Sequence, residues 1–158
     1  MFLMSADQPL ALEEAAVQLR GLLRGETDLV ANAANCAAFL VQQLGDINWL
    51  GFYFLQGEEL LLGPFQGRPA CVRIAVGQGV CGTAVSTART QVVADVHSFP
   101  GHIACDVNSR SELVVPLWRG DAVAGVIDVD SPQMDRFQAA DVHYVETLAA
   151  VFSEMQYT

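Results

Sequence analysis

Apolar residues recur at helical spacing near both ends of the chain. Residues 10–24 form a short apolar and acidic segment, and residues 26–44 show a longer repeat that stops at Gly45. A third repeat starts at Phe137. The apolar positions of the two longer repeats are Leu29, Val30, Ala33, Ala34, Ala37, Leu40, Val41 and Leu44, and then Val142, Val145, Leu148, Ala149 and Phe152. The pattern predicts two helices early in the chain and one closing helix.

The middle of the chain alternates β-branched and aromatic runs with turn residues, which is typical of antiparallel hairpins. The expected hairpins pair 47–55 with 60–65 and 112–118 with 122–130, through turns at 56–58 and 119–121. Two shorter strands are expected at 71–76 and 91–94, with a short helix at 80–88 between them. Strands grouped between terminal helices favour an α+β fold, in which helices cover a mostly antiparallel sheet.

Side-chain parity separates the two faces of this sheet, because residues two apart on a strand point to the same side. One face is apolar and is expected to contact the helices; it carries Leu50, Phe52, Phe54, Leu113, Val115, Leu117, Ile127 and Val129. If the strands are neighbours, the other face gathers aromatic and acidic side chains, namely Trp49, Tyr53, Glu112, Asp128 and Asp130. Gly51 lies between the two aromatics, so we expect an open notch there.

Residues 95–110 show no hydrophobic period at all. Long aperiodic loops inside compact domains are usually functional. This loop is long enough to fold over the acidic and aromatic face, which would make that face a ligand site. The alternative is a solvated face, because antiparallel sheets often leave one side to water.

Composition and charge narrow the classes of partner. The chain has 158 residues, 52% of them hydrophobic and 16% charged, so we expect a single globular domain spanning 1–158. The eight basic residues, all arginines, face eighteen acidic ones and leave a net charge of −10, which argues against nucleic acid and anionic membranes as partners. The first twenty residues lack a basic start and a long apolar run, so we expect no signal peptide and a cytoplasmic location.

The four cysteines have different surroundings. In a cytoplasmic protein, cysteines are more often reduced, metal-bound or catalytic than structurally bridged. Cys36 lies among alanines in a predicted helix and is expected to be a core residue. Cys71, Cys81 and Cys105 lie near glycine-rich or aperiodic segments. Three interpretations stay open for them: zinc ligands, buried small residues, or a thiol redox centre.

Two histidines in the aperiodic loop bear on the zinc alternative. His97 or His102 would supply the fourth zinc ligand, although a lone loop histidine is most often a polar surface residue. The wide spacing of the cysteines, with no Cys-x₂₋₄-Cys pair, disfavours zinc. Gly77 and Gly79 precede the short helix and are a weak signal for binding of an anion such as a carboxylate.

Five segments carry a resemblance to a known family. They are NWLGFYFL (48–55), LLLGPFQGRPACVRI (60–74), GVCGTAV (79–85), DVHSFPGHIACDVNSRSELVVPL (95–117) and GVIDVDSP (125–132). Over most of residues 45–137 the chain resembles the free methionine-(R)-sulfoxide reductases, which are stand-alone GAF-domain enzymes. The resemblance implies the GAF fold, a six-stranded antiparallel sheet with helices packed on one face and a ligand pocket under loops on the other.

The resemblance also implies roles for individual residues. Cys105 would be the nucleophile that takes the sulfoxide oxygen, Cys71 its resolving partner and Cys81 a nearby third thiol. The substrate pocket would consist of Trp49 and Tyr53, which hold the methyl-sulfur end, and of the acidic cluster Glu112, Asp128 and Asp130. We expect no metal and no cofactor.

The chemistry of these groups suggests a redox cycle. Three crowded carboxyls cannot all stay ionised, so one can act as a general acid while the others bind the ammonium of free methionine sulfoxide. Attack would leave a sulfenic acid on Cys105, which Cys71 closes to a disulfide and a thioredoxin-type dithiol reopens. The Cys105 thiolate also needs a positive neighbour, either Arg110 or backbone N–H groups of the loop.

A non-catalytic GAF sensor of a small ligand is the competing hypothesis. It would bind its ligand on the same face of the sheet. Such a sensor is normally joined to an output domain, for which 158 residues leave no room. The resemblance also allows a homodimer through the terminal helices.

Overall fold

The structure is a computed structural model, and it describes residues 8–102 and 105–158. Its helices are α1 (Leu12–Leu23), α2 (Leu29–Gln43), α3 (Gly79–Thr87) and α4 (Ala139–Tyr157), with a 3₁₀ turn at Val96–Ser98. Its strands are β1 (Trp49–Gln56), β2 (Glu59–Gln66), β3 (Arg73–Ala75), β4 (Gln91–Val93), β5 (Ser111–Arg119) and β6 (Ala122–Ser131). They form one sheet in the order β3-β2-β1-β6-β5-β4, in which every pair is antiparallel. The expected six-stranded antiparallel sheet is confirmed.

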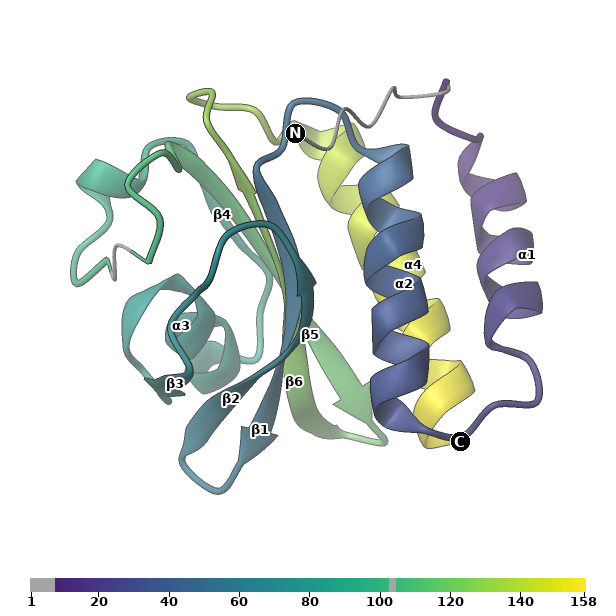
Figure 1. Ribbon diagram of the computed structural model, residues 1–158. Helices are drawn as coiled ribbons and strands as arrows, with labels where there is room; N and C mark the ends of the chain where they lie inside the picture. The colour runs from purple at the N-terminus through teal and green to yellow at the C-terminus, as the bar shows by residue number, and fades with distance from the viewer. Residues whose placement is uncertain (1–7, 103–104) are drawn as a thin grey trace.

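Three helices cover one face of the sheet (Figure 1). Helices α2 and α4 lie against the strands, and α1 packs on the outside of both. The predicted apolar face supplies the sheet side of this core, with Leu50, Phe52, Leu113, Val115, Leu117, Ile127 and Val129 all buried. Phe152 of α4 meets Phe52 of β1 with ring centres 4.8 Å apart. Side-chain parity therefore identified the helix-bearing face correctly.

The opposite face holds α3 and the long loop (Figure 1). A second apolar cluster forms there between the sheet and α3, including Leu60, Ile74, Val80, Val114 and Val126. This face is thus covered rather than simply wet, and α3 is the one described helix that does not join the helix layer.

Capping side chains move two helix starts away from the expected positions. Helix α2 starts at Leu29 rather than at residue 26, because the Asp28 carboxylate accepts the N–H of Ala31 at 2.8 Å and caps the helix. Helix α4 starts two residues after Phe137, because Gln138 and Asp141 form a reciprocal capping box.

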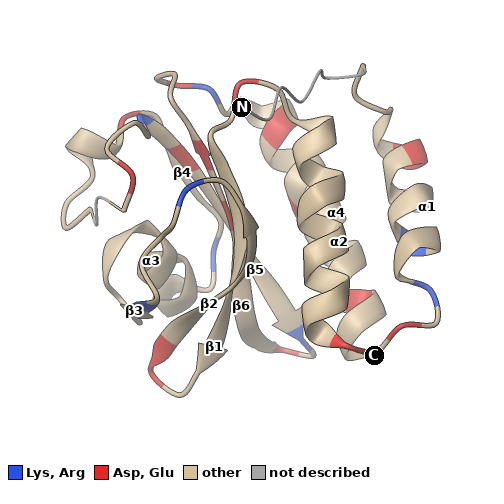
Figure 2. Ribbon diagram, viewed as in Figure 1, with Lys and Arg blue, Asp and Glu red and all other residues tan. Residues whose placement is uncertain are grey.

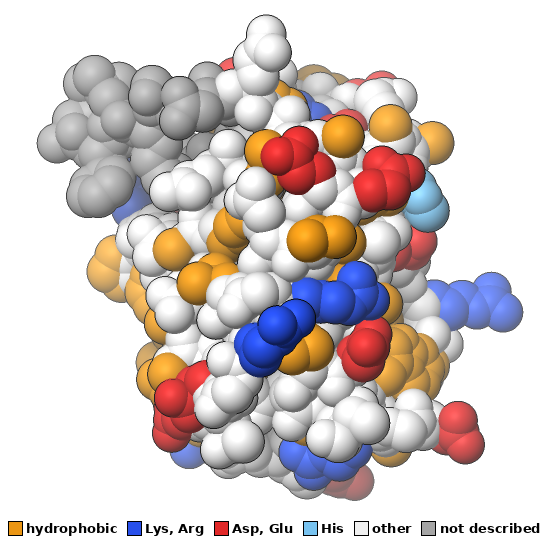
Figure 3. Space-filling model, turned by 90° about the vertical axis from the view of Figure 1, so that its right-hand side faces the viewer, with side chains coloured by type: hydrophobic (Ala, Val, Ile, Leu, Met, Phe, Trp, Pro, Cys, Tyr) orange, Lys and Arg blue, Asp and Glu red, His pale blue; other side chains and the backbone are white. Residues whose placement is uncertain are grey.

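The outer surface of the helix layer is mixed in character. Figure 3 looks onto the α1 side and shows apolar side chains separated by charged ones. Val17, Leu22 and Val30 are exposed on α1 and α2, and Arg20 pairs with Glu154 across α1 and α4. A homodimer through these helices stays a prediction. No described helix combines the length and apolar character that a bilayer span requires.

We predict that Gly125→Ala destabilises the sheet by about 1–3 kcal/mol, as overpacking usually does. A Cβ there would overlap the backbone oxygen of Tyr53 in β1 and lie 3.1 Å from the Cα of Phe54. Gly21→Ala in α1 is the matched control, because nothing lies within 4 Å of its Cβ position and alanine favours a helix. Urea unfolding measures both variants, and equal stability of the two would contradict the close approach of β1 and β6.

Candidate active site

Strand register brings the three predicted carboxyls together. In the β5–β6 pair Glu112 lies opposite Asp130 and Val114 opposite Asp128, while Gly51 of β1 faces Asp128 from the other side. Glu112 and Asp128 are each only 6% exposed. Figure 2 shows the acidic positions in red within the sheet. The expected convergence of acidic side chains on this face is confirmed.

Burial favours the neutral forms of these carboxyls, though not equally. The pKa of Glu112 is raised well above its usual value, first by burial and then by the charges of Asp128 and Asp130. Burial likewise raises the pKa of Asp130, with Asp128 and Asp106 adding to the effect. Burial raises the pKa of Asp128 too, but hydrogen bonds from Glu112 and Cys81 oppose the shift. Asp128 is therefore the best placed of the three to carry the charge, and Glu112 the best placed to hold a proton.

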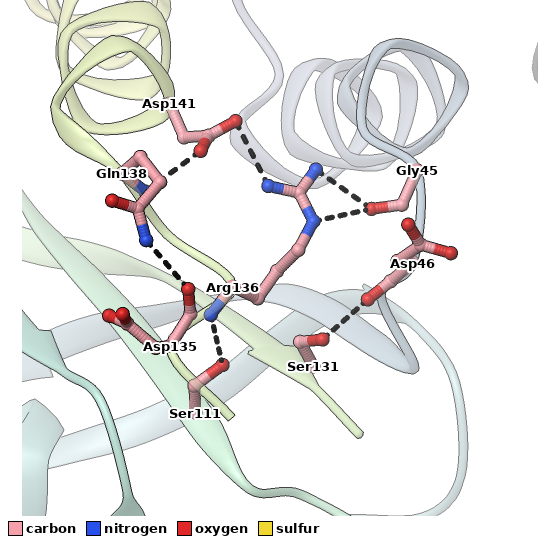
Figure 4. A network of polar contacts seen from close by, with 8 residues as sticks. All are labelled: Gly45, Asp46, Ser111, Ser131, Asp135, Arg136, Gln138 and Asp141. Atoms are coloured by element: carbon pink, nitrogen blue, oxygen red, sulfur yellow. Dashed lines mark hydrogen bonds and ion pairs between the residues drawn. The ribbon is translucent and has the colours of Figure 1, made fainter. Parts of the chain in front are cut away.

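A polar network fixes the ends of the strands that carry the acids (Figure 4). The guanidinium of Arg136 donates from Nε and Nη2 to the Gly45 carbonyl at 3.1 and 2.9 Å, and its Nη1 lies 3.0 Å from Asp141. The Ser111 hydroxyl, next to Glu112 in sequence, accepts the backbone N–H of Arg136 at 3.3 Å. Ser131, next to Asp130, donates its hydroxyl to the Asp46 carbonyl. Helix α4 and the α2–β1 corner are thereby tied to the strand positions beside the acids.

Two aromatic side chains wall the pocket, as expected. The ring centres of Trp49 and Tyr53 are 6.0 Å apart, and both side chains are almost fully buried. Trp49 Nε1 donates to the Arg68 carbonyl at 3.0 Å, and the Tyr53 hydroxyl donates to the Cys71 carbonyl at 2.8 Å. These bonds satisfy the polar tips that burial would otherwise leave unpaired.

The expectation of an open notch at Gly51 is wrong. A Cβ at Gly51 would meet the Cβ of Phe65 and the Trp49 ring, so the space is already occupied. Phe65 stacks on Trp49 with centres 5.3 Å apart. The register of β1 against β2 shifts between Gly51 and Tyr53, and Pro64 lies in β2 within this irregular stretch. Gly51 therefore serves close packing rather than ligand access.

The cysteines divide into a disulfide and two free thiols. Cys71, between β2 and β3, is bonded to Cys105 in the long loop, with Cα atoms 5.7 Å apart. Cys81 is a free buried thiol on α3, and burial together with Asp128 and Glu112 raises its pKa well above the usual value. Cys36 is fully buried in the helix-side core, as expected. Cys81 therefore stays a protonated thiol in this state.

The state of the cysteines also bears on whether the site could bind a metal ion. The zinc set considered from the sequence needed Cys71 and Cys105 as thiolates, which the disulfide excludes in this state. Among the described residues, Cys81, Glu112 and Asp128 place three ligand atoms within 4.8 Å of one another. The prediction that the site holds no metal stays a prediction.

The long loop is anchored at several points over the sheet. Asp95 caps its 3₁₀ turn, because the Asp95 carboxylate accepts the N–H of His97 at 3.1 Å. The Asn48 side-chain amide lies 3.2 Å from both the Asp106 carboxylate and the Ser109 hydroxyl. Arg110 lies 3.7 Å from Asp95 and is not among the described pocket-lining residues. Its role as the positive neighbour of Cys105 stays a prediction.

A pocket lies between the loop, α3 and the sheet. Seven of the eight predicted site residues line it, namely Trp49, Tyr53, Cys81, Cys105, Glu112, Asp128 and Asp130, and Cys71 is attached through the disulfide. Asp106, Ser109, Gln78 and Ala70 also line the pocket, which the sequence did not predict, and His102 lines it although it was expected to be a surface residue or a zinc ligand. Their position in the aperiodic and glycine-rich segments was the available signal.

The amino-acid sequence of this chain is similar to those of known proteins. A GAF domain family model matches residues 26–155. The "Free methionine-R-sulfoxide reductase" of Escherichia coli K12 is 51% identical over 129 residues, covering 82% of this chain and 78% of the relative. The protein of the same name from Saccharomyces cerevisiae is 43% identical, covering 90% of this chain and 84% of the relative. This chain belongs to the free methionine-R-sulfoxide reductase family. The GAF fold inferred from the resemblance is thereby confirmed.

A solved structure of the family agrees in fold. The free methionine-R-sulfoxide reductase from Neisseria meningitidis in complex with its substrate superposes with a TM-score of 0.88 at 39% identity, covering 97% of this chain and 95% of that chain. The shared scaffold is the curved sheet with helices on both sides that builds the pocket here.

We predict that Glu112→Gln becomes increasingly stable relative to the unchanged protein as pH rises above about 4.5, the usual pKa of this group. The folded-state pKa is raised, so the unfolded chain loses the proton first and the native state loses stability as pH rises toward the folded-state pKa. Gln removes that loss. Urea unfolding at several pH values measures it, with Glu58→Gln in the exposed β1–β2 turn as control. A constant difference between Glu112→Gln and the unchanged protein would contradict the raised pKa.

Proposed function

We propose that this chain reduces free L-methionine (R)-sulfoxide to methionine, using Cys105 as the nucleophile and Cys71 as the resolving thiol. The observation that supports it most is the Cys71–Cys105 disulfide beside a pocket lined by acids and aromatics. Family membership points to the same substrate, since relatives from two organisms carry that name. A disulfide at this place is the product that the reaction would leave.

The reaction balances with these two thiols. The Cys105 sulfur attacks the sulfoxide sulfur, the oxygen is transferred, and one thiol and one sulfoxide become one sulfenic acid and one thioether, which is methionine. The Cys71 thiol then displaces water from the sulfenic acid and forms the disulfide. An external dithiol of the thioredoxin type, with a potential near roughly −270 mV, would reduce this bond and reset the enzyme. We place this cycle in the cytoplasm.

The acidic cluster provides two different services in this proposal. A sulfoxide oxygen leaves poorly unless it is protonated, and Glu112, whose neutral form burial favours, is the proton donor. Asp128, supported by hydrogen bonds in its charged form, binds the substrate ammonium together with Asp130. One oxygen of Asp128, Oδ1, is buried without a hydrogen-bond partner among the described residues and is available to that ammonium.

The aromatic wall completes the pocket. Trp49 and Tyr53 present ring faces to the methyl-sulfur end of the substrate, and a polarisable sulfur gains about 0.3–1.5 kcal/mol from such contacts. The sensor alternative accounts for the pocket as well. It gives no account of a disulfide that pairs two of the pocket-region cysteines while leaving Cys81 free.

We predict that Cys105→Ser abolishes sulfoxide reduction while the protein stays folded, because the attacking sulfur is gone. Cys71→Ser should release about one equivalent of methionine per chain in a single turnover and then recycle poorly with thioredoxin, since resolution follows methionine release. Cys36→Ala, which removes a core thiol far from the pocket, is the matched control and should keep its activity. NADPH consumption coupled to thioredoxin and single-turnover methionine release are the two assays. Release surviving in Cys105→Ser and lost in Cys71→Ser would reverse the two roles.

We also predict discrimination among sulfoxide substrates. A charge-assisted contact to the ammonium is worth roughly 1.5–3 kcal/mol, so N-acetyl-methionine sulfoxide and a peptide-bound R sulfoxide should lose about one to two orders of magnitude in kcat/KM. The S epimer should also react poorly, because the acid and the thiol approach the sulfur from fixed sides. Methionine formed from each separated substrate is measured. Equal rates on the free and peptide-bound R sulfoxides would contradict recognition of the ammonium, and a preference for the S epimer would contradict the stereochemical assignment.

A further inference from the structure

The proposed general acid is buried and has to recover a proton after each turnover. Glu112 is only 6% exposed, between the sheet and the covering loop. Direct access of water to its carboxyl is therefore limited. Any titratable side chain between Glu112 and the solvent would set the path by which the proton returns.

One histidine occupies such a position. His102 Nε2 lies 3.7 Å from Glu112 Oε2, and the His102 side chain is 15% exposed against 8% for the Glu112 side chain. His102 also lines the pocket, so it contacts both the buried acid and the pocket space. The separation is slightly longer than a direct hydrogen bond, and a small movement closes it.

The charges around the pair favour neutral partners. Burial and the neighbouring His97 lower the pKa of His102, while burial and the carboxylates raise the pKa of Glu112. Two groups whose pKa values move toward each other exchange a proton with a small free-energy difference. The other titratable groups among the described lining residues are Tyr53 of β1, Cys81 of α3, Asp128 and Asp130 of β6, and Asp106 of the loop.

From this geometry we propose that His102 is a positioning residue that relays protons between water and the Glu112 carboxyl. The neutral imidazole takes a proton from hydronium on Nδ1, which leaves water, and releases the proton on Nε2 to the Glu112 carboxylate. One proton moves from hydronium to Glu112, no electrons are transferred, and exchange with water restores the starting tautomer. The role of Glu112 as acid rests on the proposed function, but the proton path itself does not depend on turnover.

The decisive measurement follows the Glu112 carboxyl directly. After a rapid pH drop, time-resolved infrared spectroscopy records the carbonyl stretch of the newly protonated carboxyl, and loss of that band in Glu112→Gln assigns it. We expect His102→Gln, which keeps a polar side chain of similar length but transfers no proton, to slow protonation at least about tenfold. His143→Gln, on the exposed side of α4, is the matched control with unchanged kinetics.

Chemical rescue separates a relay from a structural role. Added imidazole should restore the protonation rate in His102→Ala and leave His102→Gln slow, because only the smaller side chain opens space for it. Unchanged kinetics in both variants, or slowing that imidazole does not relieve in His102→Ala, would overturn the relay. If the unchanged protein formed no methionine from the free R sulfoxide, the proposed function would fail, while the infrared result would still decide on the relay.

Discussion

The burial of three carboxyls on one sheet face is the constraint on which the rest of the pocket depends. Charged groups in such a place are costly unless paired, and they neutralise by taking up protons instead. Here burial raises the pKa values of Glu112, Asp128, Asp130 and the Cys81 thiol, and neighbouring carboxylates add to the shift at Glu112, Asp130 and Cys81. The pocket is therefore well suited to donate a proton and poorly suited to hold a thiolate. Under the proposed function, activation of the sulfoxide by protonation has to do much of the work that a strong nucleophile would otherwise do.

The loop and the aromatic wall are coupled through Cys71. Tyr53 donates its hydroxyl to the Cys71 carbonyl, and Cys71 is bonded to Cys105 in the loop. On the other side of Cys105, Asp106 accepts a hydrogen bond from Asn48, which directly precedes β1. The chain segments that carry Cys71 and Cys105 are thus both held by hydrogen bonds from β1 or from the residue just before it. These contacts hold the two sulfur atoms in place relative to the acids, although the described loop residues around Cys105 form no regular secondary structure.

Side-chain parity predicted much of this architecture, because a period of two leaves little freedom in how a strand faces a core. It placed Phe52 and Ile127 toward the helices and Glu112 and Asp128 toward the pocket, as the structure has them. Features that depend on contacts distant in sequence escaped it. Phe65 fills the space beside Gly51, which no local pattern encodes. The position of His102 beside Glu112 likewise depends on how an aperiodic loop returns over the sheet.

The substrate itself would change the electrostatics of the pocket, because the described lining residues include acids but no arginine or lysine. Neither Arg nor Lys is found among the described lining residues, and Arg110 pairs with Asp95 instead. The ammonium of a bound amino acid would therefore bring a full positive charge into the pocket beside the carboxyls. A cation beside Asp128 removes part of the repulsion that raises the pKa of Glu112, so Glu112 becomes a stronger acid when the pocket is filled. Under the proposed function, proton donation by Glu112 is then favoured when the free amino acid is bound. A sulfoxide that lacks an ammonium would bind more weakly and would also leave Glu112 a weaker acid.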